Sequence, residues 1–392
     1  KITKKRRFTA ITFALSKKRR SPTVREGRER PMPNADSLSD VPWYSCAGID
    51  NDVVVSTRVR LARNLADFLF PSAAKKDEAE RVQTLVFDSF SHFENPDDYR
   101  VVNTETLDAL GKKILEERGV LDGSGASGIV MKGDGRLSCR VNSTDHVRIA
   151  SFEPGLNCAG AFDACRLCDD GMQKTLQFAA SYEFGYLTSI LSDAGSGMKV
   201  SIRVHLPSLV FSGEADAVLN GVRTKGLDVF SVYGSGDGYG ASLGAYYDIA
   251  TSSSLSGSEF DQTASVESAG KYLAEAERKF RRRCAENKPT EMRNLILRAF
   301  AEAKFSALLS LRQSVSIVSA VKWGLDSGIL KGVDDKVLCG LLYRVQDGHL
   351  EFLLKNGNFA FEADIQNDVR LKIERLRALI VQETFEAVRF NL

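Results

Sequence analysis

The sequence lacks several features that would place it in a specialised class of protein. It contains no run of 18 apolar residues, so it predicts no membrane-spanning helix. Only 9 prolines and 31 glycines occur in 392 residues, too few for a collagen-like or low-complexity chain. Hydrophobic residues make up 43% and charged residues 27%, the ordinary balance of a globular protein. At about 150 residues per domain, the length predicts two or three domains.

Disulfide bonds are not expected either. The seven cysteines are an odd number, and a chain of 392 residues can build its core without cross-links. Reduced thiols in a cytoplasmic protein are the simplest interpretation. Cys165 and Cys168 form a C-x-x-C pair with Cys158 seven residues earlier, but neither a second pair nor a nearby histidine completes a zinc site. We therefore expect no metal, and we expect buried thiols on one helix.

Charge is balanced overall but unevenly distributed. Residues 1–31 contain twelve Lys and Arg residues but only two acidic residues, Glu26 and Glu29, so their net charge is +10. The rest of the chain carries −8, which gives the total of +2. The acidic body does not suggest a general nucleic-acid-binding protein. A basic arm that contacts nucleic acid or a membrane is one interpretation of the leader. Because the first methionine is Met32, where globular composition begins, we expect instead that translation starts there and that residues 1–31 are not native.

Short segments rich in β-branched residues dominate the first two thirds of the body. Strands are expected at 52–60, 128–131, 137–141, 145–152, 187–191 and 199–206, with two more between 227 and 250. Helices are expected at 74–94, 104–118 and 158–180, and beyond about 262 at 264–285, 290–320 and 365–388. An apolar stripe runs from Leu297 to Val318. The sequence therefore predicts an α+β domain over 32–260 and a helical domain over 261–392.

Basic side chains recur on one face of three expected strands. They are Arg58 and Arg60, His146 and Arg148, and Lys199 and Arg203. Guanidinium groups in such an array suit phosphate oxygens, although composition alone favours a solvated outer sheet face. A glycine-rich run at 234–240 offers backbone N–H groups to phosphates. It lacks the G-K-[ST] ending of a P-loop, so a surface loop is the simpler explanation.

Five segments, in the same order along the chain, resemble blocks of a known family. VVVSTRVRLARNLADFLFP (53–71) resembles the opening signature of the ATP:guanido phosphotransferases, which include arginine and creatine kinases and the bacterial protein-arginine kinases. NSTDHVRI (142–149) is similar to the family's N-E-E-D-H-x-R-I. Three further blocks are GYLTS (185–189), GSGMKVSIRVHLPSLV (195–210) and VFSVYGSG (229–236). GYLTS, HLPSLV and the order of the two domains are closest to the protein-arginine kinases.

The resemblance implies a fold and a chemistry. The fold would be a phosphagen-kinase-like antiparallel sheet, of the kind also found in glutamine synthetases, flanked by helices and followed by a helical C-terminal domain. ATP and Mg²⁺ would be the cofactors, with a set of arginines around the phosphates. Two glutamates of the family grip a guanidinium, orient it and take its proton. A proton acceptor is needed because the guanidinium pKa lies above about 12.

The family's functional residues carry over only in part. The phosphate-binding positions are Ser56, Arg58, Arg60, Arg148 and Lys199. Lys199 replaces an arginine and keeps its charge, whereas Phe230 stands at a fifth arginine position. Thr144 and Ser235 occupy the two glutamate positions, and Ile190 occupies that of a cysteine.

Other carboxylates remain near these motifs. Asp237, two residues beyond Ser235, is the candidate substitute for a lost glutamate, whereas Asp145 is expected to face away from Thr144 on a strand. Near the C terminus, Asp368 survives from the motif that reads phosphoarginine in the protein-arginine kinases.

Two hypotheses follow from the resemblance and its departures. The first is a regulatory pseudokinase that binds nucleotide or phosphoarginine and associates with a kinase or Clp-type protease partner. The alternative is an active kinase that transfers the γ-phosphoryl group of ATP to arginine side chains of proteins. Because the departures fall on the residues that handle the proton, we favour the pseudokinase at this stage. We expect no specific nucleic acid and no membrane as partners. The apolar stripe of the helical domain offers a surface for a homodimer, although an intramolecular core is its simpler use.

Overall fold

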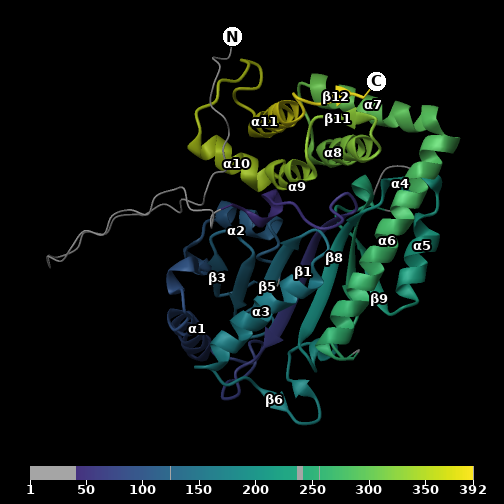
Figure 1. The fold of residues 1–392 in the computed structure, drawn as a ribbon. Helices are drawn as coiled ribbons and strands as arrows, with labels where there is room; N and C mark the ends of the chain where they lie inside the picture. Colours follow the sequence, from purple (N-terminus) through teal and green to yellow (C-terminus); the bar gives the residue numbers. More distant parts are fainter. Residues whose placement is uncertain (1–40, 124, 236–241, 256, 392) are drawn as a thin grey trace.

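The protein is described here by a computed structural model covering residues 41–123, 125–235, 242–255 and 257–391 (Figure 1). The expected start at Met32, the leader 1–31 and the candidate carboxylate Asp237 lie outside the described residues. Across the part of the chain that the structure describes, no helix combines the length and apolar character needed to cross a membrane.

An eight-stranded antiparallel sheet forms the first half of the molecule, as the α+β expectation required. Neighbouring strands are hydrogen-bonded in the order β2 (Tyr99–Asn103), β3 (Gly128–Lys132), β4 (Leu137–Val141), β5 (Val147–Pro154), β1 (Val54–Arg63), β8 (Met198–His205), β10 (Tyr246–Thr251) and β9 (Leu227–Ser231). Strand β1 lies near the centre, between β5 and β8. Its alternation sends Val59 and Leu61 to one face and Arg58 and Arg60 to the other.

The strand expected at 187–191 does not form. Only a two-residue hairpin, β6 (Ala180–Ser181) with β7 (Gly185–Tyr186), precedes it, and a 3₁₀ turn follows at Leu191–Asp193. Instead of a neighbouring strand, side chains supply the hydrogen-bond partners of its backbone groups. The Ser189 N–H donates to Oδ1 of Asp145 at 2.7 Å, and the Thr188 hydroxyl donates to the Ile190 carbonyl at 2.7 Å.

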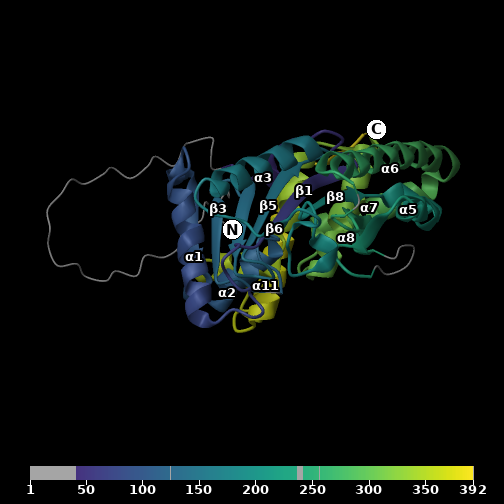
Figure 2. The ribbon, with the colours of Figure 1, turned by 90° about the horizontal axis from the view of Figure 1, so that it is seen from below.

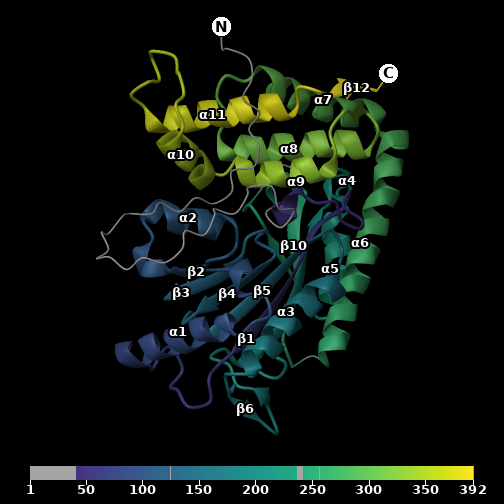
Figure 3. The ribbon, with the colours of Figure 1, turned by 60° about the vertical axis from the view of Figure 1, so that its left-hand side comes forward.

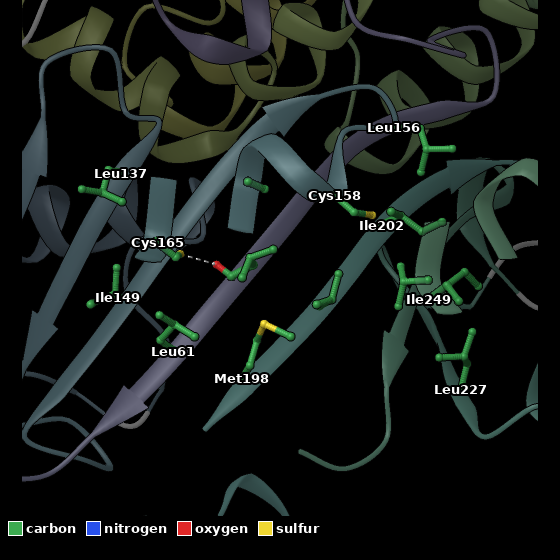
Figure 4. Packing of buried hydrophobic residues seen from close by; sticks show 14 of the residues in the cluster. Leu61, Leu137, Ile149, Leu156, Cys158, Cys165, Met198, Ile202, Leu227 and Ile249 are labelled. Carbon is green, nitrogen blue, oxygen red and sulfur yellow. Dashed lines mark hydrogen bonds between the residues drawn. The ribbon is translucent and has the colours of Figure 1, made fainter. Parts of the chain in front are cut away.

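Three helices cover the apolar face of the sheet. They are α1 (Lys76–Ser91), α3 (Cys158–Gln173) and α6 (Glu259–Asn287), all on the same side of the sheet (Figure 2). The core between them contains Leu61, Ile149, Met198 and Ile202, each at most 2% exposed (Figure 4). Burying a side chain of this size contributes about 1.5–3 kcal/mol.

The cysteines of α3 belong to this core. Cys158, Cys165 and Cys168 are free and at most 2% exposed. The Cys165 thiol donates to the Val59 carbonyl at 3.4 Å, and burial raises its pKa to about 12. A protonated, inaccessible thiol is unreactive. The expectation of buried thiols on a helix is confirmed.

The C-terminal region is helical, with its own hydrophobic core. Its helices are α7 (Pro289–Phe305), α8 (Leu311–Asp326), α9 (Asp335–Arg344), α10 (Asp347–Asn356) and α11 (Val369–Thr384), beside a small pair of strands, β11 (Leu330–Lys331) and β12 (Arg389–Phe390). The single helix expected at 290–320 is wrong, because residues 306–310 separate α7 from α8. Ser310 caps α8 in a capping box with Gln313, and Arg377 and Gln382 bond the carbonyls of Leu309 and Ser306.

Helix α6 connects the two halves (Figure 3). Its first part, including Val266 and Leu273, packs in the core of the sheet, whereas Cys284 packs in the helical core. Near the junction, buried Glu277 accepts the N–H groups of Ser208 and Leu209 at the start of α4 (Pro207–Ser212), which α5 (Ala215–Arg223) follows. The boundary at 260/261 stays a prediction.

Candidate functional site

The polar face of the sheet concentrates positive charge. Strand register places Arg60 opposite Lys199, Ser56 opposite Arg203, and Arg140 of β4 opposite Arg148. Side chains on adjacent strands at the same height lie about 5 Å apart. The expected alignment of cations from β1, β5 and β8 is therefore present. It does not form a freely solvated sheet face, because helical segments line its open side.

His146 does not share this face, contrary to expectation. Strand β5 begins one residue later, at Val147, and His146 is fully buried. Its Nδ1 accepts the Leu65 N–H at 3.0 Å, and its Nε2 lies 2.9 Å from the Leu69 carbonyl. The ring thus joins the end of β1 to the turn before β5.

A cavity of about 330 Å³ lies over Arg58 and Arg60. Its floor is the sheet, and its other side is formed by the end of α2 (Ala109–Glu117) and by α9. One end is rich in aromatic and apolar groups, among them Phe152, Phe230, Val232, Tyr233, Leu342 and Tyr343. The volume and the mixture of apolar and charged walls suit a ligand of nucleotide size.

Two arginines of the floor have unused hydrogen-bonding capacity. The Nε atoms of Arg58 and Arg60 are buried without a hydrogen-bond partner, and Arg60 makes no ion pair within the described residues. Arg58 donates only to the Gly119 carbonyl, at 2.9 Å, and its Cζ lies 4.9 Å from the centre of the Phe152 ring. Burial, followed by the charges of Arg60 and Arg140, lowers the pKa of Arg58 to about 9. Both arginines stay charged at neutral pH and face the cavity.

Arg203, by contrast, is already engaged. Its Nε and Nη2 donate to the two carboxylate oxygens of Asp248 at 2.9 and 3.0 Å. Burial would lower the pKa of Arg203, but the charge and hydrogen bonds of Asp248 outweigh it and raise the pKa well above its usual range. The pair adds no net charge to the aromatic end of the cavity.

A smaller cavity of about 100 Å³ continues from Arg60 along the sheet. Arg140, Arg148 and Lys199 line it together with Asp193. Asp193 lies 2.9 Å from Nζ of Lys199 and 3.2 Å from Nη2 of Arg148. Arg60 lines both cavities, so they are neighbours on the sheet, and we call them together the cleft: the larger cavity holds its aromatic end and the smaller its cationic end.

Comparison with known proteins assigns the chain to a family. Residues 81–280 match the model of the ATP:guanido phosphotransferase C-terminal catalytic domain. The chain belongs to the ATP:guanido phosphotransferase family. The protein-arginine kinase of Syntrophomonas wolfei is 30% identical over 309 residues, covering 77% of this chain and 85% of the relative. That of Halothermothrix orenii is 30% identical over 337 residues, covering 84% and 95%.

Solved structures of the family share the fold. Lombricine kinase superposes with a TM-score of 0.50 at 18% identity, over 62% of this chain and 72% of that one. The substrate-free duplicated taurocyamine kinase from Schistosoma mansoni gives a TM-score of 0.53 at 17% identity, over 73% of this chain and 42% of that one. The family uses ATP, and the cationic cleft lies on the sheet of its catalytic domain.

The two residues expected at the glutamate positions of the family lie in loops of this protein. Thr144 is half-buried in the turn before β5, and Ser235 is exposed, with its carbonyl accepting from Arg312 at 2.8 Å. Asp145 is not on a strand, as had been expected, but in the same turn. It is fully buried and accepts from Arg148, Asn64 and the Ser189 N–H. Those bonds use both of its oxygens.

The remaining expected positions are also placed. Ser56, 7% exposed, lines the larger cavity, as does Phe230, which is 54% exposed. Ile190 lines the smaller cavity beside Asp193. Asp368 is the N-cap of α11 and accepts the Leu371 N–H at 3.0 Å, so its carboxylate has a structural partner.

A metal ion would need most of its ligands from elsewhere. No cluster of three or more His, Cys, Asp or Glu side chains that could hold a metal occurs among the described residues. Mg²⁺ typically binds through one or two carboxylates, several waters and substrate phosphates. Such an ion fits this cleft only as part of a nucleotide complex.

Two residues of the cleft escaped the sequence analysis. Arg140 lies on β4 within LSCRV, and only its pairing with Arg148 shows that it reaches the same cavity. Asp193 lies in a turn, where alternation gives no direction. The period-2 pattern of β4 could have indicated the face of Arg140, but no local signal indicated Asp193.

Proposed function

We propose that the protein binds ATP in the cleft and transfers its γ-phosphoryl group to arginine side chains of proteins. The unpaired, buried Nε atoms of Arg58 and Arg60 carry this proposal. An isolated buried charge costs several kcal/mol, and a site that keeps two of them side by side is suited to an anion. The protein-arginine kinases among the relatives favour transfer to arginine as the reaction.

The two ends of the cleft support one orientation of ATP. Phe230 and Tyr233 at the aromatic end suit the base, because aromatic faces stack on planar rings. The Phe152 ring, stacked on Trp43 and covered by Arg58, holds Arg58 in place instead. Arg58 and Arg60 then meet the first phosphates, and the γ-phosphate lies toward the smaller cavity. This places the transferred group next to the end where Ile190 meets solvent, 40% exposed.

Each cation would have a distinct part. The guanidinium forks of Arg58 and Arg60 can bind two phosphate oxygens at once. Arg148, which Asp145 holds through Nε at 2.9 Å, adds positive charge beside them. Lys199 supplies charge without a fork, and the Ser56 hydroxyl can donate one hydrogen bond. Mg²⁺ bound with ATP would neutralise charge between the β- and γ-phosphates.

A second candidate function is a nucleotide-binding regulator. Thr144 and Ser235 favour it, because neither side chain can act as a carboxylate base. A positioned acid–base group contributes about 10²–10⁴ in rate, and losses within one site are not additive. In this case nucleotide, or phosphoarginine near Asp368, would control association with a kinase or protease partner.

Product analysis separates the two candidates. The protein is incubated with Mg-ATP and an arginine-rich protein such as protamine, and phosphoarginine is sought by mass spectrometry without acid, which cleaves the P–N bond. Phosphoarginine formed by the wild type supports the kinase. ATP binding without product, together with product from a Thr144→Glu, Ser235→Glu double variant, supports the regulator. Absence of ATP binding contradicts both.

A further inference from the structure

Asp193 lies among the cations of the smaller cavity. It is the one acidic residue lining the smaller cavity within the described chain, and its neighbours there include Arg60, Arg148 and Lys199. Its side chain lines the cavity and is 8% exposed. The 3₁₀ turn Leu191–Asp193 fixes its backbone, with the Asp193 N–H donating to the Ile190 carbonyl at 2.9 Å.

The other carboxylates around the cleft are less suitable. Glu116, which lines the larger cavity, is exposed near the end of α2. Asp145 has no exposed surface and is held by three donors. Asp248 is committed to both nitrogens of Arg203 at the aromatic end. Asp122 pairs with Arg140 from a loop, and Glu117 accepts the Gly348 N–H beyond Arg58. Only Asp193 faces the cavity from a position beside the cations of the γ-phosphate end.

We infer that Asp193 is the carboxylate that binds the substrate guanidinium and accepts its proton, in place of the glutamates that this chain lacks. This inference rests on the proposed kinase function. Without ATP, Asp193 is shared between Lys199 and Arg148. The γ-phosphate brings negative charge to the same two cations, so the flexible Lys199 can turn to its oxygens. Arg148 stays anchored to Asp145 and shares its charge with the phosphate. Asp193 then loses Lys199 as a partner inside the cavity and is available to an arriving cation.

The reaction step balances with groups already named. One guanidinium N–H proton moves to a carboxylate oxygen of Asp193, and the freed nitrogen lone pair attacks the γ-phosphorus. The bond between the γ-phosphorus and the β–γ bridging oxygen breaks, and ADP leaves with those electrons. The protonated Asp193 returns its proton to solvent when the product departs. Because the carboxylate is released by the phosphate, ATP should bind before the arginine.

The position of Asp193 also defines how a protein substrate would approach. Ile190 and Leu191, on the same turn, are 40% and 82% exposed. An arginine reaching Asp193 past these residues would place its neighbouring residues on their apolar surface. A flexible surface segment could enter in this way more easily than an arginine within a helix or a sheet.

Asp193→Asn tests the inference, because asparagine keeps the size and can still accept from Lys199. The variant should lose at least about 100-fold in phosphoarginine formation. Its ATP affinity should stay equal or become tighter, because two cations are freed of a competing charge. The control Asp163→Asn removes the same charge from an exposed pair with Arg166 on α3 and should leave both properties unchanged. Thermal unfolding checks that each variant is folded.

A less basic substrate identifies the proton step. In a peptide with canavanine in place of arginine, the oxyguanidino group gives up its proton far more readily. The deficit of Asp193→Asn should therefore shrink at least about tenfold with this peptide, whereas a merely misfolded site would lose both substrates equally. Full turnover of arginine by Asp193→Asn, with tighter ATP binding, would show that Asp193 only competes with phosphate and would overturn the inference.

Binding tests the inference even if the wild type makes no product. Loaded with a non-hydrolysable ATP analogue, the wild type should bind an arginine peptide at least about tenfold more tightly than the citrulline peptide, which lacks the charge. Asp193→Asn should lose this preference. If the loaded wild type does not distinguish the two peptides, Asp193 is not the guanidinium partner. Product from a wild type that fails this test would leave the kinase function standing without Asp193.

Discussion

Replacing Arg60 by methionine should stabilise the fold and weaken nucleotide binding at the same time. The Arg60 Nε is buried without a partner, and no ion pair offsets the charge within the described residues. Burial, then the charges of Arg148 and Arg140, lower its pKa, which means that the folded protein holds this charge at a cost. Methionine fills a similar length without a charge to desolvate. At few positions in a protein should replacement of a buried arginine raise the free energy of unfolding.

The structure sets the size of both effects. An unsatisfied buried polar group costs about 1–3 kcal/mol, so Arg60→Met should gain free energy of unfolding in that range. The unfolding midpoint should rise by about 2–4 °C for each kcal/mol. In the ATP complex, one charge-assisted hydrogen bond contributes about 1.5–3 kcal/mol, so its loss should weaken ATP binding about 10- to 150-fold.

Arg63→Met is the matched control on the same strand. Arg63 faces the opposite side of β1, is 1% exposed, and pairs with Asp169 at 3.0 Å. Removing it leaves the Asp169 carboxylate buried and unpaired, at a cost of about 3–5 kcal/mol, without touching the cleft. Thermal unfolding and calorimetric titration with Mg-ATP are measured for both variants. A lower midpoint and an unchanged dissociation constant for Arg60→Met would refute the assignment of the cleft as an anion site.

Three further predictions address the cleft and its stability. Arg140→Met should weaken ATP binding severalfold in calorimetry, whereas Asp122→Asn should tighten it, since that carboxylate competes with phosphate for Arg140; weakening by both variants would contradict competition. Phe230→Arg should tighten ATP binding but not adenosine binding, because it adds a cation at the rim of the cavity; equal gains for both ligands would point to stacking instead. Burial lowers the pKa of His205 well below its usual range, so the unfolded chain binds a proton that the folded chain excludes. The free energy of unfolding should therefore fall as pH drops below about 6.5, by up to about 1.4 kcal/mol per pH unit. Measured by urea unfolding at several pH values, the free energy of unfolding of His205→Asn should depend less steeply on pH than that of the wild type.

Alternation within strands made the sheet predictable. In β1 and β8, apolar and polar residues exchange faces at every step, so Val59 and Val200 enter the core while Arg58 and Lys199 stay outside. The same reasoning gave a wrong prediction for the segment at 187–191. There the backbone N–H of Ser189 donates to the carboxylate of Asp145, which is distant in the sequence, and not to a neighbouring strand. The pattern of a segment does not show whether a partner strand is present.

The break between α7 and α8 had a local signal that the apolar stripe concealed. Ser310 followed by Gln313 is a capping box, and it marks the start of a helix inside the segment at 290–320. The stripe continues across the break because α7 and α8 pack in the same core. Periodicity alone therefore joined two helices, and Arg377, which bonds the Leu309 carbonyl between them, is too distant in the sequence to be recognised.

The cleft divides into parts that sequence patterns reveal and parts that they do not. Its cations stand on strands, where register with β5 and β8 fixes the position of each residue of β1, so a motif match predicts a place in space. The proton-accepting positions belong to loops: Thr144 and Ser235, expected at the family's glutamate positions, lie in loops, and Asp193 ends a 3₁₀ turn. A loop can gain or lose a carboxylate without disturbing the sheet, whereas a strand arginine is surrounded by neighbours of fixed register. During evolution, the residues at the phosphate end of such a site should therefore change slowly and those at the proton-accepting end quickly. Loss of a glutamate from one loop does not by itself mean loss of the reaction when another loop presents a carboxylate to the same cavity.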